Sequence, residues 1–116
     1  MAVYVDDVRH RYGRMIMCHL WADTLEELHA MADRIGVQRK WFQRPPGASW
    51  EHYDISLGKK ALAIKYGSVL TDRYGPIEHV ARLAIASGDP QRVEYGKRRL
   101  SQIARRRASE AEERDG

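Results

Sequence analysis

The sequence predicts a small α/β protein with a small mixed or mostly parallel sheet, flanking helices and a C-terminal helical hairpin. Two observations lead to this fold class. Short β-rich runs alternate with helical patterns over residues 1–72, whereas from residue 73 onward the apolar residues recur at helical spacing. We therefore expect an α/β domain at 1–72 and a helical extension with a basic tail at 73–116, which either belongs to the same compact unit or serves for oligomerisation.

Five short segments are predicted to be extended. Residues 2–5 are β-rich, residues 15–21 are apolar apart from one histidine, and residues 37–42 alternate bulky and polar side chains. Residues 52–55 and 68–70 are shorter runs of the same kind. The polar stretch between the first two runs is interpreted as a connection. The order of strands and helices indicates at least some parallel pairing.

The first predicted helix begins after a capping box. Thr24 can accept a hydrogen bond from the main chain of Glu27, and the Glu27 side chain can reach back. Apolar residues then follow at helical spacing over 25–35, and Gly36 suits the left-handed position after the helix. This segment is therefore the clearest helix of the chain.

Three further helices are expected. Ser56 can cap a helix over about 57–66. Pro76 suits the first turn of a helix that ends near Gly88. Pro90 restarts a helix with one apolar side and one basic side, and we expect this helix to fray into the acidic C-terminus. The last two helices would form the hairpin.

Composition excludes several classes of protein. Hydrophobic residues make up 43% of the 116-residue chain, which is enough for one folded core. Cys18 is the only cysteine, so a secreted disulfide scaffold is excluded and a reducing, cytoplasmic location is expected. The acidic N-terminal segment and the absence of a long apolar run predict neither a signal peptide nor a membrane span. Glycine-rich phosphate loops, dinucleotide-binding fingerprints and hydrolase nucleophile elbows are absent.

Positive charge is concentrated in the tail. Residues 1–90 carry 12 Lys/Arg against 11 Asp/Glu, whereas residues 91–107 carry 7 against 1. The candidate nucleic-acid contacts in this tail are Arg98, Arg99, Arg105, Arg106 and Arg107. The alternative is a solvated helix face whose apolar side packs on the body or on a second subunit in a homodimer.

Ionisable side chains gather at the ends of the predicted elements. They are Asp6, Asp7, His19, Asp23, His52 and Asp54. If the strands are parallel, several of these groups would converge at one edge of the sheet, where α/β proteins bind ligands. The structural alternatives are a turn for the Asp pair, a hydrogen-bonded core histidine for His19 and helix capping for Asp23.

Basic and aromatic residues near this edge have two interpretations. Lys59 and Lys60 lie at a helix N-terminus, where a nearby anion would offset the unfavourable helix dipole, although solvated lysines are the simpler explanation. Trp41 and Phe42 are core residues, or they stack on a base beside Arg39. Cys18 lies in a predicted buried strand and is not expected to be a nucleophile.

A combination of short motifs resembles a known family. The motifs are Val3-Tyr4-Val5-Asp6-Asp7, His19-Leu20-Trp21-Ala22-Asp23-Thr24 running into Glu26-Glu27-Leu28-His29, Arg34-Ile35-Gly36, Trp41-Phe42-Gln43 and His52-Tyr53-Asp54. Over about residues 2–72 they are similar to the bacterial and phage family called domain of unknown function 4031. The resemblance implies no particular activity. The family's pattern singles out Asp6, Asp7, His19, Asp23, Glu27, Gln43, His52 and Asp54.

Two functions from different classes are expected. The first is a pocket for a phosphate-bearing ligand, a nucleotide or nucleic acid, and, if the protein is an enzyme, metal-assisted phosphoester hydrolysis. Its residues would be His19, His52 and Asp54 for catalysis, Asp6 and Asp7 for Mg²⁺ or Mn²⁺, and Arg39, Gln43 and Lys60 for the ligand. The second is a non-catalytic interaction or nucleic-acid-binding accessory protein, of phage type, that acts through the basic tail.

Overall fold

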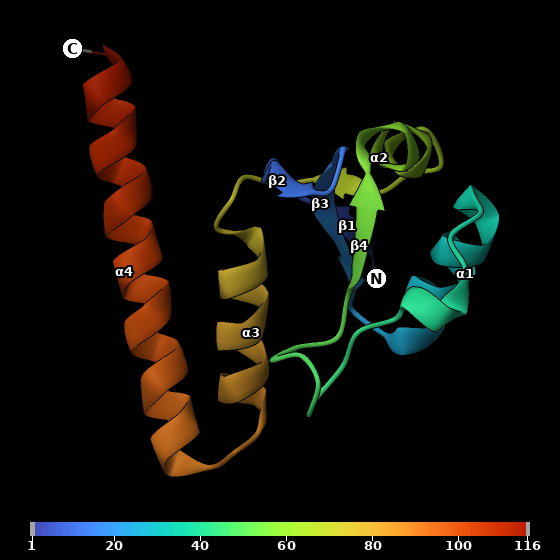
Figure 1. Cartoon of the computed structure of the whole chain (residues 1–116). Helices are drawn as coiled ribbons and strands as arrows, with labels where there is room; N and C mark the ends of the chain where they lie inside the picture. The colour runs from blue at the N-terminus through green and yellow to red at the C-terminus, as the bar shows by residue number, and fades with distance from the viewer. Residues whose placement is uncertain (1, 116) are drawn as a thin grey trace. The chain divides into compact units, whose positions relative to one another are not determined.

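The computed structural model describes residues 2–115, and its chain forms two compact units, 1–73 and 74–116 (Figure 1). The first unit is mixed α/β and the second is helical. In the first unit, five strands form one sheet with both parallel and antiparallel pairs. The strands are β1 (Val3–Val5), β2 (His10–Tyr12), β3 (Met15–Ala22), β4 (Tyr53–Ser56) and β5 (Val69–Leu70). The sheet is therefore mixed, as the sequence predicts.

The long strand β3 organises the sheet. It pairs antiparallel with β1 through residues 20–22, with β2 through residues 15–17 and with β4 through residues 17–20. Because a strand has two edges and the β4 pairing overlaps the other two, β1 and β2 must share one edge of β3 while β4 occupies the opposite edge. The parallel pair is β1 with β5.

One face of this sheet carries the core of the first unit. Side chains alternate along β3, so Cys18, Leu20 and Ala22 point to one face and His19 and Trp21 point to the other. The buried residues on the core side come from the sheet and from both helices: Val5, Cys18, Leu20, Ala22, Leu28, Ala32, Ile35, Tyr53, Ile55 and Ala63. Helices α1 (Leu25–Ile35) and α2 (Leu57–Lys65) thus pack on the same face, opposite to His19.

Both helices begin at the predicted caps. The Thr24 hydroxyl accepts from the main-chain N–H of Glu27 and donates to the Glu27 carboxylate, which completes the capping box of α1. Gly36 follows in the left-handed conformation with φ of 81°. The Ser56 hydroxyl caps α2 by accepting from the N–H of Lys59.

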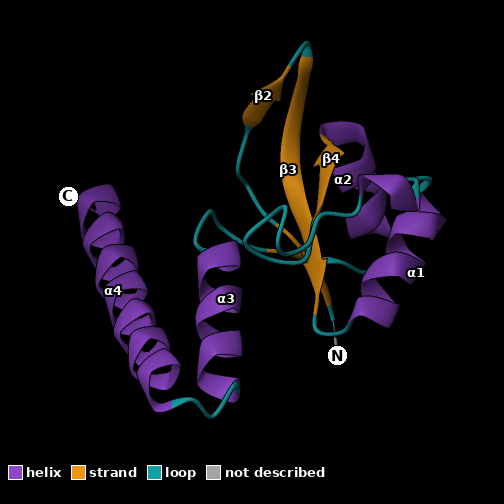
Figure 2. Cartoon of the chain, turned by 60° about the horizontal axis from the view of Figure 1, so that its bottom comes forward, coloured by secondary structure: helices purple, strands orange, loops and turns teal. Residues whose placement is uncertain are grey.

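Two local predictions are wrong. Residues 37–42 do not form a strand, because they contain the 3₁₀ helix η1 (Arg39–Trp41). The supposed connection between the first two strands contains β2, which forms a hairpin with β3. Gly13 supplies the positive φ of 61° at the first turn position, which suits a two-residue hairpin turn. This hairpin extends past the end of β4 (Figure 2).

The second unit is the predicted helical hairpin. It consists of α3 (Gly75–Ala86) and α4 (Pro90–Asp115). A side chain at Gly96 of α4 would lie 2.5 Å from the carbonyl oxygen of Ala81, so glycine allows the two helices to approach closely. The expected fraying is wrong, since α4 is helical to Asp115. Within residues 2–115, no helix combines the length and the apolar character needed to cross a membrane.

Candidate metal centre

A polar cluster occupies the sheet face opposite to the α1 and α2 core. His19 of β3 lies directly across from Asp54 of β4, so their side chains share a face. His10 of β2 lies across from Met17, two residues from His19, and its ring stacks on that of His19 at 5.3 Å. His52 precedes Asp54 by two residues and joins the same face. These four residues, His10, His19, His52 and Asp54, are called the imidazole cluster below.

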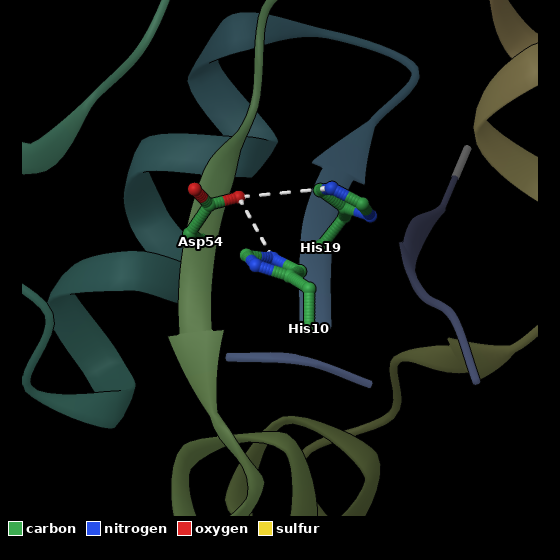
Figure 3. Close-up of side chains that lie close together, drawn as sticks. All are labelled: His10, His19 and Asp54. Atoms are coloured by element: carbon green, nitrogen blue, oxygen red, sulfur yellow. Dashed lines mark ion pairs between the residues drawn. The ribbon is translucent and has the colours of Figure 1, made fainter. Parts of the chain in front are cut away.

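The cluster converges on one oxygen atom. Oδ1 of Asp54 lies 3.8 Å from Nε2 of His10, 3.8 Å from Nε2 of His19 and 3.4 Å from Nε2 of His52. Figure 3 shows the side chains of His10 and His19 directed at the Asp54 carboxylate from neighbouring strands. The ligand atoms of His10, His19 and Asp54 all lie within 4.8 Å of one another.

Asp6 fixes the orientation of the His19 ring. The β1–β3 ladder stops at Leu20 and the β2–β3 ladder starts at Met17, so the main-chain N–H of His19 has no strand partner on that edge. Oδ1 of Asp6 accepts this N–H, and Oδ2 lies 2.7 Å from Nδ1 of the His19 ring. Because an ionised carboxylate only accepts, Nδ1 carries the proton and Nε2 of neutral His19 presents a lone pair toward Asp54.

His52 and Asp54 are held in a similar way. Nδ1 of His52 lies 3.0 Å from the carbonyl oxygen of Trp50, which can only accept, so Nδ1 carries a proton. In the neutral ring, Nε2 therefore faces Asp54 with a lone pair. The ring of Trp50 stacks on His52 at 4.2 Å. The side-chain amide of Gln43 donates to Oδ2 of Asp54 at 2.8 Å, which leaves Oδ1 to the imidazoles.

Two buried polar atoms of the cluster have no hydrogen-bond partner among the described residues. Nε2 of His10 and Oδ1 of Asp54 are shielded from solvent and have no hydrogen-bond partner among residues 2–115. Lone pairs of neutral imidazoles that face a carboxylate oxygen repel it unless a proton or a cation lies between them. The arrangement is therefore suited to a bound cation.

The charges of the cluster favour the same conclusion. Burial opposes ionisation of Asp54, but the contact with His52 in its protonated form and the hydrogen bond from the Gln43 amide outweigh it and lower the pKa of Asp54 to about 2. Burial also tends to lower the pKa of His19, but the hydrogen bond to Asp6 and the charges of Asp6 and Asp54 raise this pKa above its ordinary value. Asp54 is thus an anion at neutral pH, surrounded by neutral or protonated imidazoles.

The donor set fits a divalent transition ion. Imidazole nitrogen and carboxylate oxygen are the usual ligands of Zn²⁺ and related ions, whereas Mg²⁺ prefers oxygen alone. A histidine ligand almost always donates its second ring N–H to a carboxylate or a carbonyl, as His19 does to Asp6 and His52 does to Trp50. His10, His19 and Asp54 could therefore hold an ion, with His52 beside it.

The structure brings some of the predicted site residues together but not all. Asp6, Gln43 and the cluster residues His19, His52 and Asp54 are contiguous. The convergence does not arise from parallel strands, as the sequence suggested, because β1, β3 and β4 pair antiparallel. Asp6 contacts His19 rather than forming a ligand pair with Asp7, which lies 3.0 Å from Nζ of Lys60.

Other predicted ligand residues have partners elsewhere. Arg39 is exposed and forms an ion pair with Asp33. The Asp23 carboxylate accepts from the Tyr4 hydroxyl and the N–H of Ala2, so it ties β1 to the end of β3. Trp41 is 57% exposed, so it is not the core residue that the sequence suggested.

The tail arginines differ among themselves. Arg107 pairs with Glu78 of α3, and Arg99 donates to Gln102. The side chains of Arg98, Arg105 and Arg106 are exposed. The basic character of α4 is therefore divided between contacts inside the second unit and an exposed face.

Sequence reasoning missed His10 and Trp50. His10 stood in the polar stretch interpreted as a connection, although the alternation of His10 and Tyr12 with Arg9 and Arg11 is a strand pattern. Trp50 lies in the loop before β4, and its contacts with His52 and Trp21 depend on how that loop folds. No short-range sequence pattern predicts that Trp50 lies beside the imidazole cluster.

The fold and the cluster define a mixed α/β protein with a histidine- and carboxylate-lined sheet face. The chain belongs to the DUF4031 family, described as proteins of unknown function, whose model matches residues 3–85. The match covers the first unit and reaches α3, so it extends beyond the residues 2–72 that carry the resemblance. No curated protein and no solved structure matches the chain.

Proposed function

We propose that the protein is a metal-dependent hydrolase of a phosphate-bearing ligand, with its catalytic centre at the imidazole cluster. One observation carries the proposal. The Nε2 atoms of His10 and His19 face Oδ1 of Asp54, and that oxygen has no hydrogen-bond partner within the described chain. A divalent ion in this position would satisfy the lone pairs that otherwise oppose one another.

In this proposal His10, His19 and Asp54 hold the ion. Two imidazoles and one carboxylate favour Zn²⁺ or Mn²⁺ over Mg²⁺. Three protein ligands would leave coordination positions for water and substrate, as catalytic sites require. Such an ion lowers the pKa of water and offsets negative charge on phosphate oxygens.

Protein groups would carry the remaining steps of hydrolysis. The water oxygen would form a bond to phosphorus and the bond from phosphorus to the ester oxygen would break. The leaving oxygen would depart as an alcohol by taking up a proton equivalent to the one that His52 removes from the attacking water. His52 would take the proton of the attacking water at Nε2, because the Trp50 carbonyl holds the other ring nitrogen as an N–H. Asp6 positions His19 and is not itself expected to touch the substrate.

The test is turnover of aryl phosphate mono- and diesters by protein freed of metal and reloaded with Zn²⁺, Mn²⁺ or Mg²⁺. We expect His52→Ala to reduce kcat about a hundredfold or more, the typical contribution of a proton-transferring residue, while metal binding persists. His29→Ala is the control, since His29 contacts Tyr53 on the other side of the sheet. Equal turnover of His52→Ala and wild type, or no turnover with any ion, would refute the proposal.

A second candidate is a non-catalytic polyanion-binding protein that uses α4. What favours it is the exposure of Arg98, Arg105 and Arg106, for which no ion-pair partner lies among residues 2–115. Nucleic-acid binding by these residues would weaken steeply with salt. The double substitution of Arg98 and Arg105 by Ala should then abolish binding, whereas substitutions in the imidazole cluster should leave it unchanged.

A further inference from the structure

The β2–β3 hairpin differs from the rest of the first unit in charge. Residues 8–22 contain Arg9, Arg11 and Arg14 and no Asp or Glu, whereas the body of the chain is close to neutral. All three arginines are exposed, and no carboxylate lies within ion-pair distance of them in the described structure. The nearest acidic residues in sequence are already engaged, because Asp6 contacts His19 and Asp7 contacts Lys60.

The hairpin also presents an exposed aromatic ring beside the cluster. Tyr12 is 70% exposed and stands opposite Met15, which is 47% exposed. Because side chains alternate along a strand, Tyr12 points to the same face as His10, two residues or about 7 Å away. One nucleotide can bridge such a distance between its phosphate and its base.

We propose that the β2–β3 hairpin binds single-stranded nucleic acid, with a base stacked on Tyr12 and the flanking phosphates paired with two arginines. Arg14 lies in the turn next to Tyr12, and Arg11 begins on the opposite face of β2 and would reach around its free edge. Aromatic rings and unpaired arginines on one exposed element are the combination that binds single strands with little sequence preference. Guanidinium groups match phosphate oxygens through paired hydrogen bonds. The proposal rests on the proposed hydrolase function, since it names the substrate class as a single-stranded phosphodiester.

The position of the hairpin gives this binding a consequence. His10 belongs to the same strand as Tyr12 and its Nε2 faces Asp54. A single-stranded nucleic acid bound to the hairpin would therefore have a phosphodiester next to the imidazole cluster. Small aryl phosphates would need only the metal ligand His10 of this hairpin, whereas oligonucleotides would also need Tyr12 and the arginines.

The test is fluorescence anisotropy of labelled oligothymidine and oligouridine of about 12 nucleotides with the full chain and a chelator present, so that no hydrolysis is needed. Tyr12→Ala should weaken binding about tenfold, and Tyr12→Phe should bind as wild type because the ring remains. Replacing both Arg11 and Arg14 by Ala should reduce the slope of log affinity against log salt by about one to two.

The double substitution of Arg98 and Arg105 by Ala is the matched control, because it removes the same charge from α4. Equal affinities of wild type and Tyr12→Ala, a larger loss in the α4 variant, or a preference for duplex over single strands would each overturn the proposal. Turnover of a small aryl diester separates the two proposals. If wild type turns it over but Tyr12→Ala leaves oligonucleotide binding unchanged, the substrate class is wrong and the hydrolase stands.

Discussion

Asp6 and His19 are joined twice, through the main-chain N–H of His19 and through Nδ1 of its ring, 2.7 Å from Oδ2 of Asp6. Asp6 is fully buried, so this contact is protected from competition by water. The contact decides which ring nitrogen of His19 faces Asp54, and hence which His19 atom the proposed metal centre would use.

Replacing Asp6 by Asn should weaken metal binding without removing a ligand. The asparagine amide can donate to Nδ1 of His19, which would move the ring proton to Nε2 and block the ligand atom. We expect a 10- to 100-fold loss of Zn²⁺ or Mn²⁺ affinity in calorimetric titrations, the usual effect of removing such an outer contact. Asp7→Asn is the control, because Asp7 is exposed and contacts Lys60. Equal affinities for the two variants would contradict the role of Asp6.

The stability of the metal-free protein should depend on pH at two limits. The folded-state pKa of His19 is raised above 6.5, so its contribution is complete below that value and is lost as pH rises through the raised pKa. The folded-state pKa of Asp54 is lowered from 3.8 to about 2, so its contribution is present above 3.8 and is lost as pH falls toward 2.

Urea unfolding across pH measures both limits. His19→Gln should reduce the loss of unfolding free energy as pH rises through the raised pKa of His19. Asp54→Asn should reduce the loss of unfolding free energy as pH falls toward 2. A wild-type curve that is level from pH 3.8 to about 2, or an acid limb that survives in Asp54→Asn, would show that Asp54 is not held as an anion by its neighbours.

Cys18 should be unreactive in the folded protein. Burial, together with the negative charge of Asp6, raises the pKa of its thiol to about 12, so almost no thiolate is present at neutral pH. Iodoacetamide should label Cys18 in denaturant and leave it unlabelled in buffer, as mass spectrometry would detect. Rapid labelling of the native protein would mean that β3 opens readily or that Cys18 is not in the core.

Short-range sequence patterns correctly predicted the helix whose two ends they determine. The capping box of Thr24 and Glu27 and the left-handed Gly36 set both ends of α1, because each involves residues near in sequence. The alternating pattern of residues 37–42 wrongly predicted a strand. The main-chain N–H of Val37 donates to the carbonyl of Ala32 at the end of α1, and the chain then forms η1. Six residues of alternation are too few to outweigh such contacts.

The candidate site was predicted in its members more than in its geometry. His19, His52 and Asp54 could be selected by residue type and by their places at strand ends. Their convergence depends on antiparallel pairing of β3 with β4 and on the position of β2, which are long-range properties of the sheet. For the same reason the sequence placed Asp6 among the metal ligands, whereas in the fold it contacts His19.

Gly96→Ala should destabilise the helical hairpin. An added Cβ would lie 2.5 Å from the Ala81 carbonyl oxygen and 2.7 Å from Cγ1 of Ile85, so α3 and α4 would have to move apart. We expect a loss of about 1–3 kcal/mol in the free energy of unfolding, although alanine favours helices intrinsically. Ser101→Ala, on the exposed side of α4, is the control and should be neutral or slightly stabilising. A Gly96→Ala variant as stable as wild type in thermal melts would show that the helices do not cross at this position.

Calorimetric titration of metal-free protein with Zn²⁺ and Mn²⁺ is the sharpest test of a metal centre at the imidazole cluster. We expect one ion per chain for wild type and at least a hundredfold weaker binding for both His10→Ala and Asp54→Asn, because each removes one of three ligands. His10 is a sharp probe, since it lies in an edge strand and its side chain is 36% exposed, so the fold should survive the substitution. Saturable binding that both variants retain, or no binding by wild type, would contradict a metal centre at the imidazole cluster.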